Sequence, residues 1–324
     1  MLLNVGLILL GLFLLVAGGE ALLRGAVGLA TLARLTPAVI GLTVVAAGTS
    51  VPELAVSAAA AAQGKTDITV GNVVGSNIFN ITFIVGLAAV ISPLAISGNT
   101  VRLEYPVLAL VTLMCVAVGD RGSVARLDTI LFLAVYVGFT AYLVSLVRGQ
   151  ATAAEAAQLA EETRELADGP AHRPRIWSSA GLVAAGVGLL AGGAHLTVLG
   201  AVEVGRALGM SERLIGLTIV SIGTGLPEVV TSVVSAVRGR ADVALGNVIG
   251  SNLFNILIVL GVTGVIAPLP VADGIAGSDN WWMLGFTLLL FPIMLTGKQV
   301  KRWEGGLLLT VYGIYLAVLL GRAE

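Results

Sequence analysis

The chain alternates long apolar segments with short polar ones. Apolar runs such as Leu7 to Val16, Val107 to Val118 and Leu284 to Leu295 each lie within a stretch of about 20 residues, which is the length of helix needed to cross the hydrocarbon of a bilayer. This pattern predicts ten membrane helices. Their expected ranges are 3–32, 37–62, 68–92, 104–119, 128–147, 177–208, 212–237, 243–267, 281–297 and 304–321.

The composition agrees with an all-α integral membrane protein. The 324 residues are 57% hydrophobic and only 11% charged, whereas soluble domains keep about 25% charged residues. The formal net charge of −1 offers no electrostatic basis for binding nucleic acid. The single cysteine, Cys115, cannot form an internal disulfide, and two histidines are too few for a histidine-based metal centre. The first apolar run is longer than a signal peptide and has no basic residue before it, so we expect it to be the first membrane helix.

One polar segment divides the helices into two groups of five. We expect residues 1–147 to form a first five-helix repeat, 148–176 a connector, and 177–324 a second five-helix repeat. If the N-terminus is outside, eleven basic residues lie in the inside connections and six in the outside ones. The positive-inside rule therefore predicts an outside N-terminus and a cytoplasmic connector.

The two halves repeat the same motif at an offset of 175 residues. Gly71 to Ile81 reads GNVVGSNIFNI and Gly246 to Ile256 reads GNVIGSNLFNI, with nine of eleven positions identical. Because five is an odd number of crossings, the second copy must enter the membrane from the opposite side. Inverted repeats with binding sites at their interface are typical of secondary transporters.

Glu53 and Glu228 are carboxylates deep within predicted membrane helices, where charge is costly and usually marks an ion pathway. Each follows a proline, which lacks an N–H and loosens the carbonyl four residues earlier. Thr49 and Thr224 lie four residues before them and share their helix faces. All of these groups are hard oxygen donors of the kind that calcium prefers, and the absence of soft ligands disfavours copper or zinc.

The repeated motif adds a serine and an asparagine on one face of each following helix. These are Ser76 with Asn80, and Ser251 with Asn255. The asparagines suit either a cation site or a hydrogen bond between helices. Small residues nearby favour close approach of a neighbouring helix: Gly71 and Gly75 in the first half, and Gly246 and Gly250 in the second.

These motifs resemble the paired alpha repeats of the sodium/calcium exchanger family, prokaryotic type, within the calcium/cation antiporter superfamily. The matching residues are GTSVPE at Gly48 to Glu53 and GTGLPE at Gly223 to Glu228, each followed by GN-x-x-GSN-x-x-N. The resemblance implies a secondary active antiporter that exchanges Ca²⁺ for Na⁺ by alternating access. It also implies that the helices predicted at 3–32 and 177–208 slide against the other eight.

The resemblance carries roles to particular positions. The implied calcium site comprises Glu53, Glu228, Thr49 and Thr224. The implied sodium positions comprise Ser50, Ser76, Ser251, Asn80 and Asn255, with the carbonyls of Ala46 and Ser221. We therefore expect a multi-pass protein of the plasma (inner) membrane with no catalytic role. We expect Ca²⁺, Na⁺ and membrane lipid as its partners, no resident cofactor, and no protein partner.

Two departures from the family pattern bear on the coupling ion. Gly225 stands where the first half has Ser50, and Asn255 stands where many exchangers have aspartate. Two glutamates balance one Ca²⁺ or two Na⁺, so we hypothesise two-for-one exchange. The alternatives are an H⁺/Ca²⁺ exchanger of the same fold, a passive channel, and a membrane-embedded metal-dependent enzyme.

Overall fold

The computed structural model describes residues 2–33, 35, 37–64, 66–96, 100–150, 175–209, 221–295 and 297–322. Most of the predicted connector at 148–176, and the first part of the predicted helix at 212–237, lie outside this range. The boundaries of the two repeats and the connector therefore stay predictions.

The described elements of the first half are helical, apart from two short strands. The helices are α1 (Leu2–Ala33), α2 (Pro37–Ile40), α3 (Ala46–Thr49), α4 (Val51–Ala62), α5 (Thr66–Phe79), α6 (Val85–Ile91), α7 (Tyr105–Gly119) and α8 (Arg126–Gln150). Three π-helical turns are η1 (Gly41–Val45), η2 (Asn80–Ile84) and η3 (Thr100–Glu104), and the strands are β1 (Leu94–Ala95) and β2 (Ser123–Val124).

The second half repeats this order. Its helices are α10 (Ile176–Ala207), α12 (Ser221–Thr224), α13 (Leu226–Val237), α14 (Ala241–Phe254), α15 (Leu260–Ile266), α16 (Asn280–Leu295) and α17 (Arg302–Arg322). The π-helical turns are η5 (Asn255–Val259) and η6 (Ile275–Asp279), and the strands are β3 (Leu269–Pro270) and β4 (Gln299–Val300).

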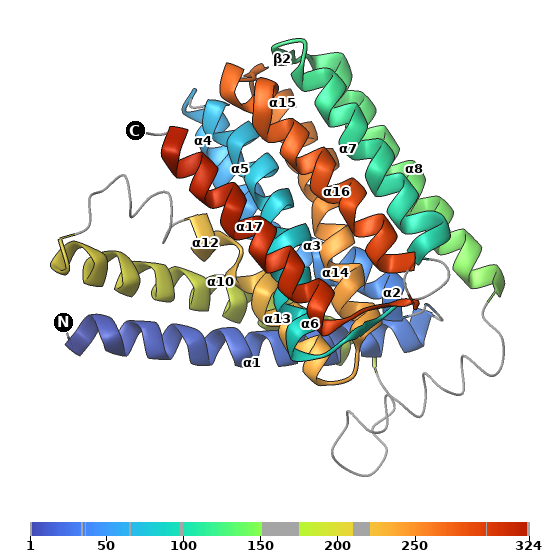
Figure 1. The fold of residues 1–324 in the computed structure, drawn as a ribbon. Coiled ribbons are helices and arrows are strands. Elements are labelled where there is room, and N and C mark those ends of the chain that lie inside the picture. The colour runs from blue at the N-terminus through green and yellow to red at the C-terminus, as the bar shows by residue number, and fades with distance from the viewer. Residues whose placement is uncertain are drawn as a thin grey trace.

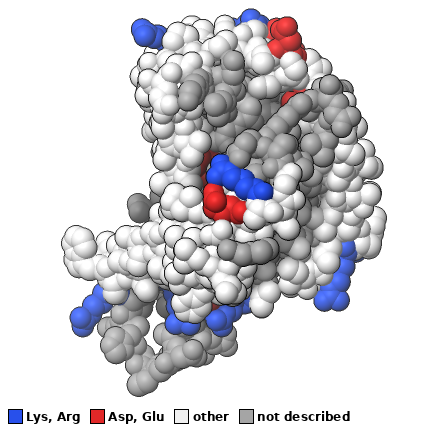
Figure 2. All heavy atoms as spheres, turned by 90° about the vertical axis from the view of Figure 1, so that its left-hand side faces the viewer, with Lys and Arg blue, Asp and Glu red and all other residues white. Residues whose placement is uncertain are grey.

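Six of the described helical segments are long and apolar enough to span a membrane, and a seventh qualifies if one bent pair counts as a single span. This confirms an all-helical membrane protein, while the count of ten spans stays a prediction. Large apolar side chains cover much of the outside: Leu2, Trp177 and Leu127 are 92%, 86% and 77% exposed. Figure 2 shows a face that is mostly uncharged, with Lys, Arg, Asp and Glu confined to a few places. Such a surface suits lipid.

The prediction of one continuous helix at 37–62 is wrong. The segment Gly41–Thr49 meets α4 at an angle of 51°. The break falls at Ser50, whose ψ of 6° leaves helical geometry. Pro52 explains it, because proline has no N–H to bond the carbonyl of Gly48, four residues earlier, and its ring clashes with that carbonyl. The second half breaks in the same way at Gly225, between α12 and α13.

Helices α1 and α10 lie side by side, at a steep angle to the other long helices (Figure 1). Glycines permit this contact. A Cβ on Gly11 would lie 2.7 Å from the Gly193 carbonyl oxygen, and a Cβ on Gly25 would lie 2.7 Å from the Ser179 carbonyl oxygen. The residue numbers therefore rise along α1 while those of the facing residues fall along α10, so the two helices are antiparallel. Since they are equivalent elements of the repeat, the halves are inverted, as predicted.

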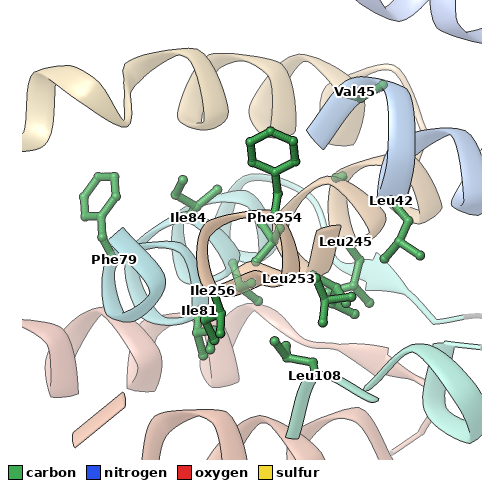
Figure 3. Close-up of a cluster of buried hydrophobic side chains, with 14 of the residues drawn as sticks. Leu42, Val45, Phe79, Ile81, Ile84, Leu108, Leu245, Leu253, Phe254 and Ile256 are labelled. Carbon is green, nitrogen blue, oxygen red and sulfur yellow. The ribbon is translucent and has the colours of Figure 1, made fainter. Parts of the chain in front are cut away.

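The short strands tie the halves together with the same symmetry. Strand β1 pairs with β4, placing Leu94 opposite Val300, and β2 pairs with β3, placing Val124 opposite Leu269. Each antiparallel pair therefore takes one strand from each half. The core is shared as well: Figure 3 shows Phe79 and Ile84 in one cluster with Phe254 of the second half.

Candidate cation-binding site

The two predicted carboxylates occupy equivalent places in the fold. Glu53 is the third residue of α4, and Glu228 is the third residue of α13. Their exposed fractions are 2% and 1%. Both helices begin just after a break, so each carboxylate lies in a helical first turn, where the helix dipole favours negative charge. The proline-induced breaks therefore place the acids at two buried helix N-termini.

The fold brings these two acids together from positions 175 residues apart. Ser50, at the break before α4, donates from its Oγ to Glu228 Oε1 at 3.0 Å. The carboxylates of Glu53 and Glu228 are close enough to interact electrostatically. One buried site therefore holds a hydroxyl and a carboxylate of the first half and a carboxylate of the second.

Several oxygens at this site have no hydrogen-bond partner within the protein. They are Glu53 Oε2, Glu228 Oε2 and Asn255 Oδ1, all fully buried. Leaving buried carboxylate oxygens unpaired is costly unless a cation or donor meets them. Carboxylate, amide and hydroxyl oxygens are the ligands that Ca²⁺ and Na⁺ prefer, and they fit these ions as transported substrates.

The carboxylate count bears on the charge of the ion. Among the described residues, no group of three or more Asp, Glu, His or Cys side chains is arranged to hold a metal. The site described above combines two carboxyl groups with neutral oxygens. Two ionised carboxylates would balance one divalent cation.

A second group of predicted residues converges beside the acids. The Thr49 hydroxyl lies 3.2 Å from the Ala46 carbonyl oxygen, 3.2 Å from Asn247 Oδ1 and 3.5 Å from Ser251 Oγ. Its single proton can serve one of these oxygens at a time. Ala46 and Thr49 of α3 therefore lie together with Ser251 of α14, and the ligand roles that the resemblance implies for them stay predictions.

Asn80 and Asn255 begin the π-helical turns η2 and η5. Single π-turns inside α-helices are frequent at functional sites. Asn80 donates from Nδ2 to Asn252 Oδ1 at 3.1 Å, which joins the two halves. One of the two predicted asparagines thus has a protein partner, whereas the other keeps an unpartnered oxygen.

The remaining predicted residues lie on α5 and α12, close in sequence to Asn80 and Glu228. Ser76 is partly buried on α5, one turn before Asn80. Thr224 is partly buried at the end of α12, one turn before Glu228, and Ser221 begins that helix. Ligand roles for these residues stay predictions.

The departure at Gly225 has a structural counterpart. A Cβ at this position would lie 2.8 Å from Cε1 and 3.1 Å from Cδ1 of Phe79. The ring of Phe79 therefore occupies the space that a serine side chain would need. The first half offers a hydroxyl at the equivalent position, Ser50, and the second half offers an aromatic ring.

The sequence favours a structural role for Asn247 and Asn252 of the repeated motif, whose Oδ1 atoms lie 3.2 Å from the Thr49 hydroxyl and 3.1 Å from Asn80 Nδ2. Sequence reasoning missed two further buried polar residues. Thr231 and Ser235 are fully buried on α13. Their spacing of three and seven residues from Glu228 was the available signal, because such positions share a helix face.

The fold and the site together define a multi-pass membrane protein of the ion-exchanger class, built from two inverted halves around buried oxygen ligands. The family model described as "Sodium/calcium exchanger protein" matches residues 3–145 and 178–321. The chain belongs to the sodium/calcium exchanger family.

Individual relatives agree over nearly the whole chain. It is 41% identical to the "Putative antiporter CaxA" of Alkalimonas amylolytica, over 94% of this chain and 95% of that protein. It is 32% identical to the "Sodium/calcium exchanger MaX1" of Methanosarcina acetivorans, covering 98% of each. The solved sodium-calcium exchanger NCX_Mj, soaked with zero Na⁺ and Ca²⁺, superposes with a TM-score of 0.82 at 30% identity, covering 98% of this chain and 99% of that one.

Proposed function

We propose that this protein is a secondary active antiporter that exchanges Ca²⁺ for Na⁺ across the membrane by alternating access. The observation that carries the proposal is the pair of buried carboxylates, Glu53 and Glu228, each with one oxygen lacking a partner in the protein. The names of MaX1 and NCX_Mj support Na⁺ and Ca²⁺ as the two substrates. The protein then needs no catalytic residue and no resident cofactor.

The same carboxylates serve both ions in turn. A single Ca²⁺ neutralises two glutamates, and so do two Na⁺ ions. Because a buried site of low dielectric strongly disfavours net charge, release of one set of ions favours binding of the other. This competition for shared charge is what couples the two fluxes.

We propose a stoichiometry of two Na⁺ for one Ca²⁺. A third Na⁺ would leave one excess positive charge beside two carboxylates. The ring of Phe79 fills the space beside Gly225, so the second half provides no hydroxyl there. Asn255 contributes a neutral amide where a carboxylate would add charge. Exchange is then electroneutral.

The proposed placement follows from the distribution of basic residues. The protein lies in the plasma (inner) membrane with its N-terminus outside and the 148–176 connector in the cytoplasm. Residues 1–147 and 177–324 form the two five-helix repeats of a ten-helix antiporter.

The test is uptake of radiolabelled calcium into proteoliposomes loaded with Na⁺. We expect uptake only when Na⁺ is lower outside than inside, and none in Glu53→Gln or Glu228→Gln. Glu203→Gln is a matched control, because Glu203 is 52% exposed in a surface ion pair with Arg206 on α10. Uptake that ignores the Na⁺ gradient and follows a pH gradient would assign the protein to H⁺/Ca²⁺ exchange.

The stoichiometry needs a second measurement in the same vesicles. Clamping the membrane potential with K⁺ and valinomycin should leave the rate and extent of uptake unchanged if exchange is electroneutral. Voltage-dependent uptake that moves the charge expected for three Na⁺ per Ca²⁺ would overturn the two-sodium proposal. It would leave the proposal of Na⁺/Ca²⁺ exchange intact.

A further inference from the structure

A row of buried oxygens runs along one face of α13, away from the carboxylate site. Glu228 Oε2, Thr231 Oγ1 and Ser235 Oγ have no hydrogen-bond partner, and all three residues are at most 1% exposed. Spacings of three and four residues place them on one helix face. At a rise of 1.5 Å per residue, the row extends about 10 Å from the carboxylate toward the end of the helix. Buried hydroxyls without partners usually require an explanation.

Helix α1 covers this face. The two helices pack together, and the Thr231 hydroxyl lies 3.8 Å from where a Cβ on Gly19 would stand. The Thr231 hydroxyl therefore lies beside α1, and Ser235 shares its helix face one turn further along. Separating these two helices would uncover this face of α13.

An ion pair joins α1 to α13 at the outer end of the row. Arg238, the residue after α13, lies with its Nη2 3.0 Å from Glu20 Oε1 on α1. Arg24 Nε contacts the same oxygen at 2.8 Å. The Glu20 side chain is 21% exposed and that of Arg238 is 49% exposed. The ion pair thus lies where the covered face meets the surface.

The first half has no equivalent of this arrangement. Offsetting by 175 residues, Val56 and Ala60 replace Thr231 and Ser235, and Gln63 replaces Arg238. Val56 is 45% exposed, whereas Thr231 is 0% exposed. Among the described residues, α10 makes no contact with α4 as extensive as that of α1 with α13. The asymmetry is therefore both chemical and conformational.

We propose that this face of α13 is the path by which the transported cation passes between Glu228 and the membrane surface beside Arg238. Helix α1 closes the path in this structure, and the Glu20–Arg238 ion pair is its gate. Hydroxyl oxygens replace part of the water shell of a cation that enters such a path. The inference rests on the proposed cation transport, but it adds a route, a direction and a closing contact that the transport proposal does not contain.

The test uses single cysteines in a Cys115→Ala background, because Cys115 is the one native cysteine. Thr231→Cys and Ser235→Cys are nearly isosteric changes. Their matched controls are Val56→Cys and Ala60→Cys on α4. Proteoliposomes are treated with a membrane-impermeant cationic methanethiosulfonate reagent from either side, and the labelled fraction is followed by mass spectrometry.

We expect Ser235→Cys to react from one side only, opposite to the side from which Val56→Cys reacts. Adding Glu20→Gln should speed the labelling of Ser235→Cys about fivefold, the effect of losing a partly exposed ion pair, and should leave Val56→Cys unchanged. Saturating Ca²⁺ should slow Thr231→Cys more than Val56→Cys.

Labelling does not need transport, so it separates this proposal from the proposed function. If Ser235→Cys and Thr231→Cys stay unreactive from both sides with and without Glu20→Gln, while Val56→Cys reacts, the path is wrong even if Na⁺/Ca²⁺ exchange is observed. If they label as expected but no Ca²⁺ uptake occurs, the path stands and the cation assignment fails.

Discussion

Replacing Gly250 with alanine should destabilise the protein, whereas the same change at Gly75 should not. These glycines are equivalent positions of the repeated motif. A Cβ on Gly250 would lie 2.6 Å from the Ala46 Cβ and 2.7 Å from the Leu42 carbonyl carbon. Around Gly75, nothing lies within 4 Å of such an atom. The predicted close approach of a helix at this motif is thus confirmed at Gly250 and absent at Gly75.

Two energies of opposite sign determine how each substitution changes the free energy of unfolding. Overpacking a tight contact costs about 1–3 kcal/mol, and Gly250→Ala should fall near the upper end because the clash involves backbone that cannot rotate away. Replacing glycine by alanine inside a helix gains up to about 1 kcal/mol. Gly75→Ala should therefore change stability by between about 0 and +1 kcal/mol. The two variants should differ by roughly 2–4 kcal/mol.

The measurement is thermal unfolding of both purified variants in detergent, followed by the fluorescence of the four tryptophans. Calcium uptake by each variant is measured in parallel. We expect a lower unfolding midpoint and reduced uptake for Gly250→Ala, because the clash displaces Ala46 and the adjoining Thr49. Gly75→Ala should keep the unfolding midpoint and the calcium uptake of the unmodified protein.

Two outcomes would contradict a contact confined to Gly250. If neither variant changes the midpoint, α14 does not approach η1 as closely as the structure describes. If both lower it equally, the glycines act through a property common to both halves, such as helix flexibility, and the one-sided contact is not what matters.

Three further perturbations follow from the same contacts. Gly225→Ser should destabilise the protein, because the new side chain would collide with the ring of Phe79. Adding Phe79→Leu should restore folding and make calcium uptake voltage-dependent. Electroneutral uptake in a folded double variant would contradict the proposed role of Gly225 in setting the stoichiometry. Ser50→Ala removes a hydroxyl that the resemblance implies as a sodium ligand, and should weaken the apparent Na⁺ affinity about tenfold. The measurement is the Na⁺ concentration that half-inhibits uptake from outside, and an unaltered value would remove this residue from the sodium site. Gly18→Leu should lower the unfolding midpoint, because its Cβ would lie 2.8 Å from a backbone nitrogen of α10. Gly6→Leu should not lower it, because nothing lies within 4 Å of a Cβ at that position. Equal midpoints would argue against close packing of α1 on α10.

Much of the architecture was predictable because its signals are local. Apolar stretches of membrane length follow from the cost of exposing backbone and charge to lipid. The 175-residue repeat predicted the inversion that α1 and α10 display. The prediction failed at 37–62, where the position of Pro52 breaks the helix at Ser50.

The acids of the site were also predictable, because a carboxylate in a membrane helix is costly wherever the helix packs. Glu53 and Glu228 could therefore be identified before their neighbours were known. Their hydrogen-bond partners could not be predicted from the sequence. That Ser50 donates to Glu228, and not to the acid of its own helix, depends on how the two halves meet.

The membrane class, the inverted duplication and the carboxylates follow from the sequence alone, because hydropathy, repeat period and charge within apolar segments are local properties of the chain. Which copy of each repeated position makes a contact depends on how the two halves pack. The tertiary structure places Phe79 against Gly225, packs Gly250 and not Gly75 against a neighbour, and sets the Thr231 hydroxyl of α13 beside α1. These differences arise from contacts between residues far apart in the chain, where nearly identical motifs meet different neighbours.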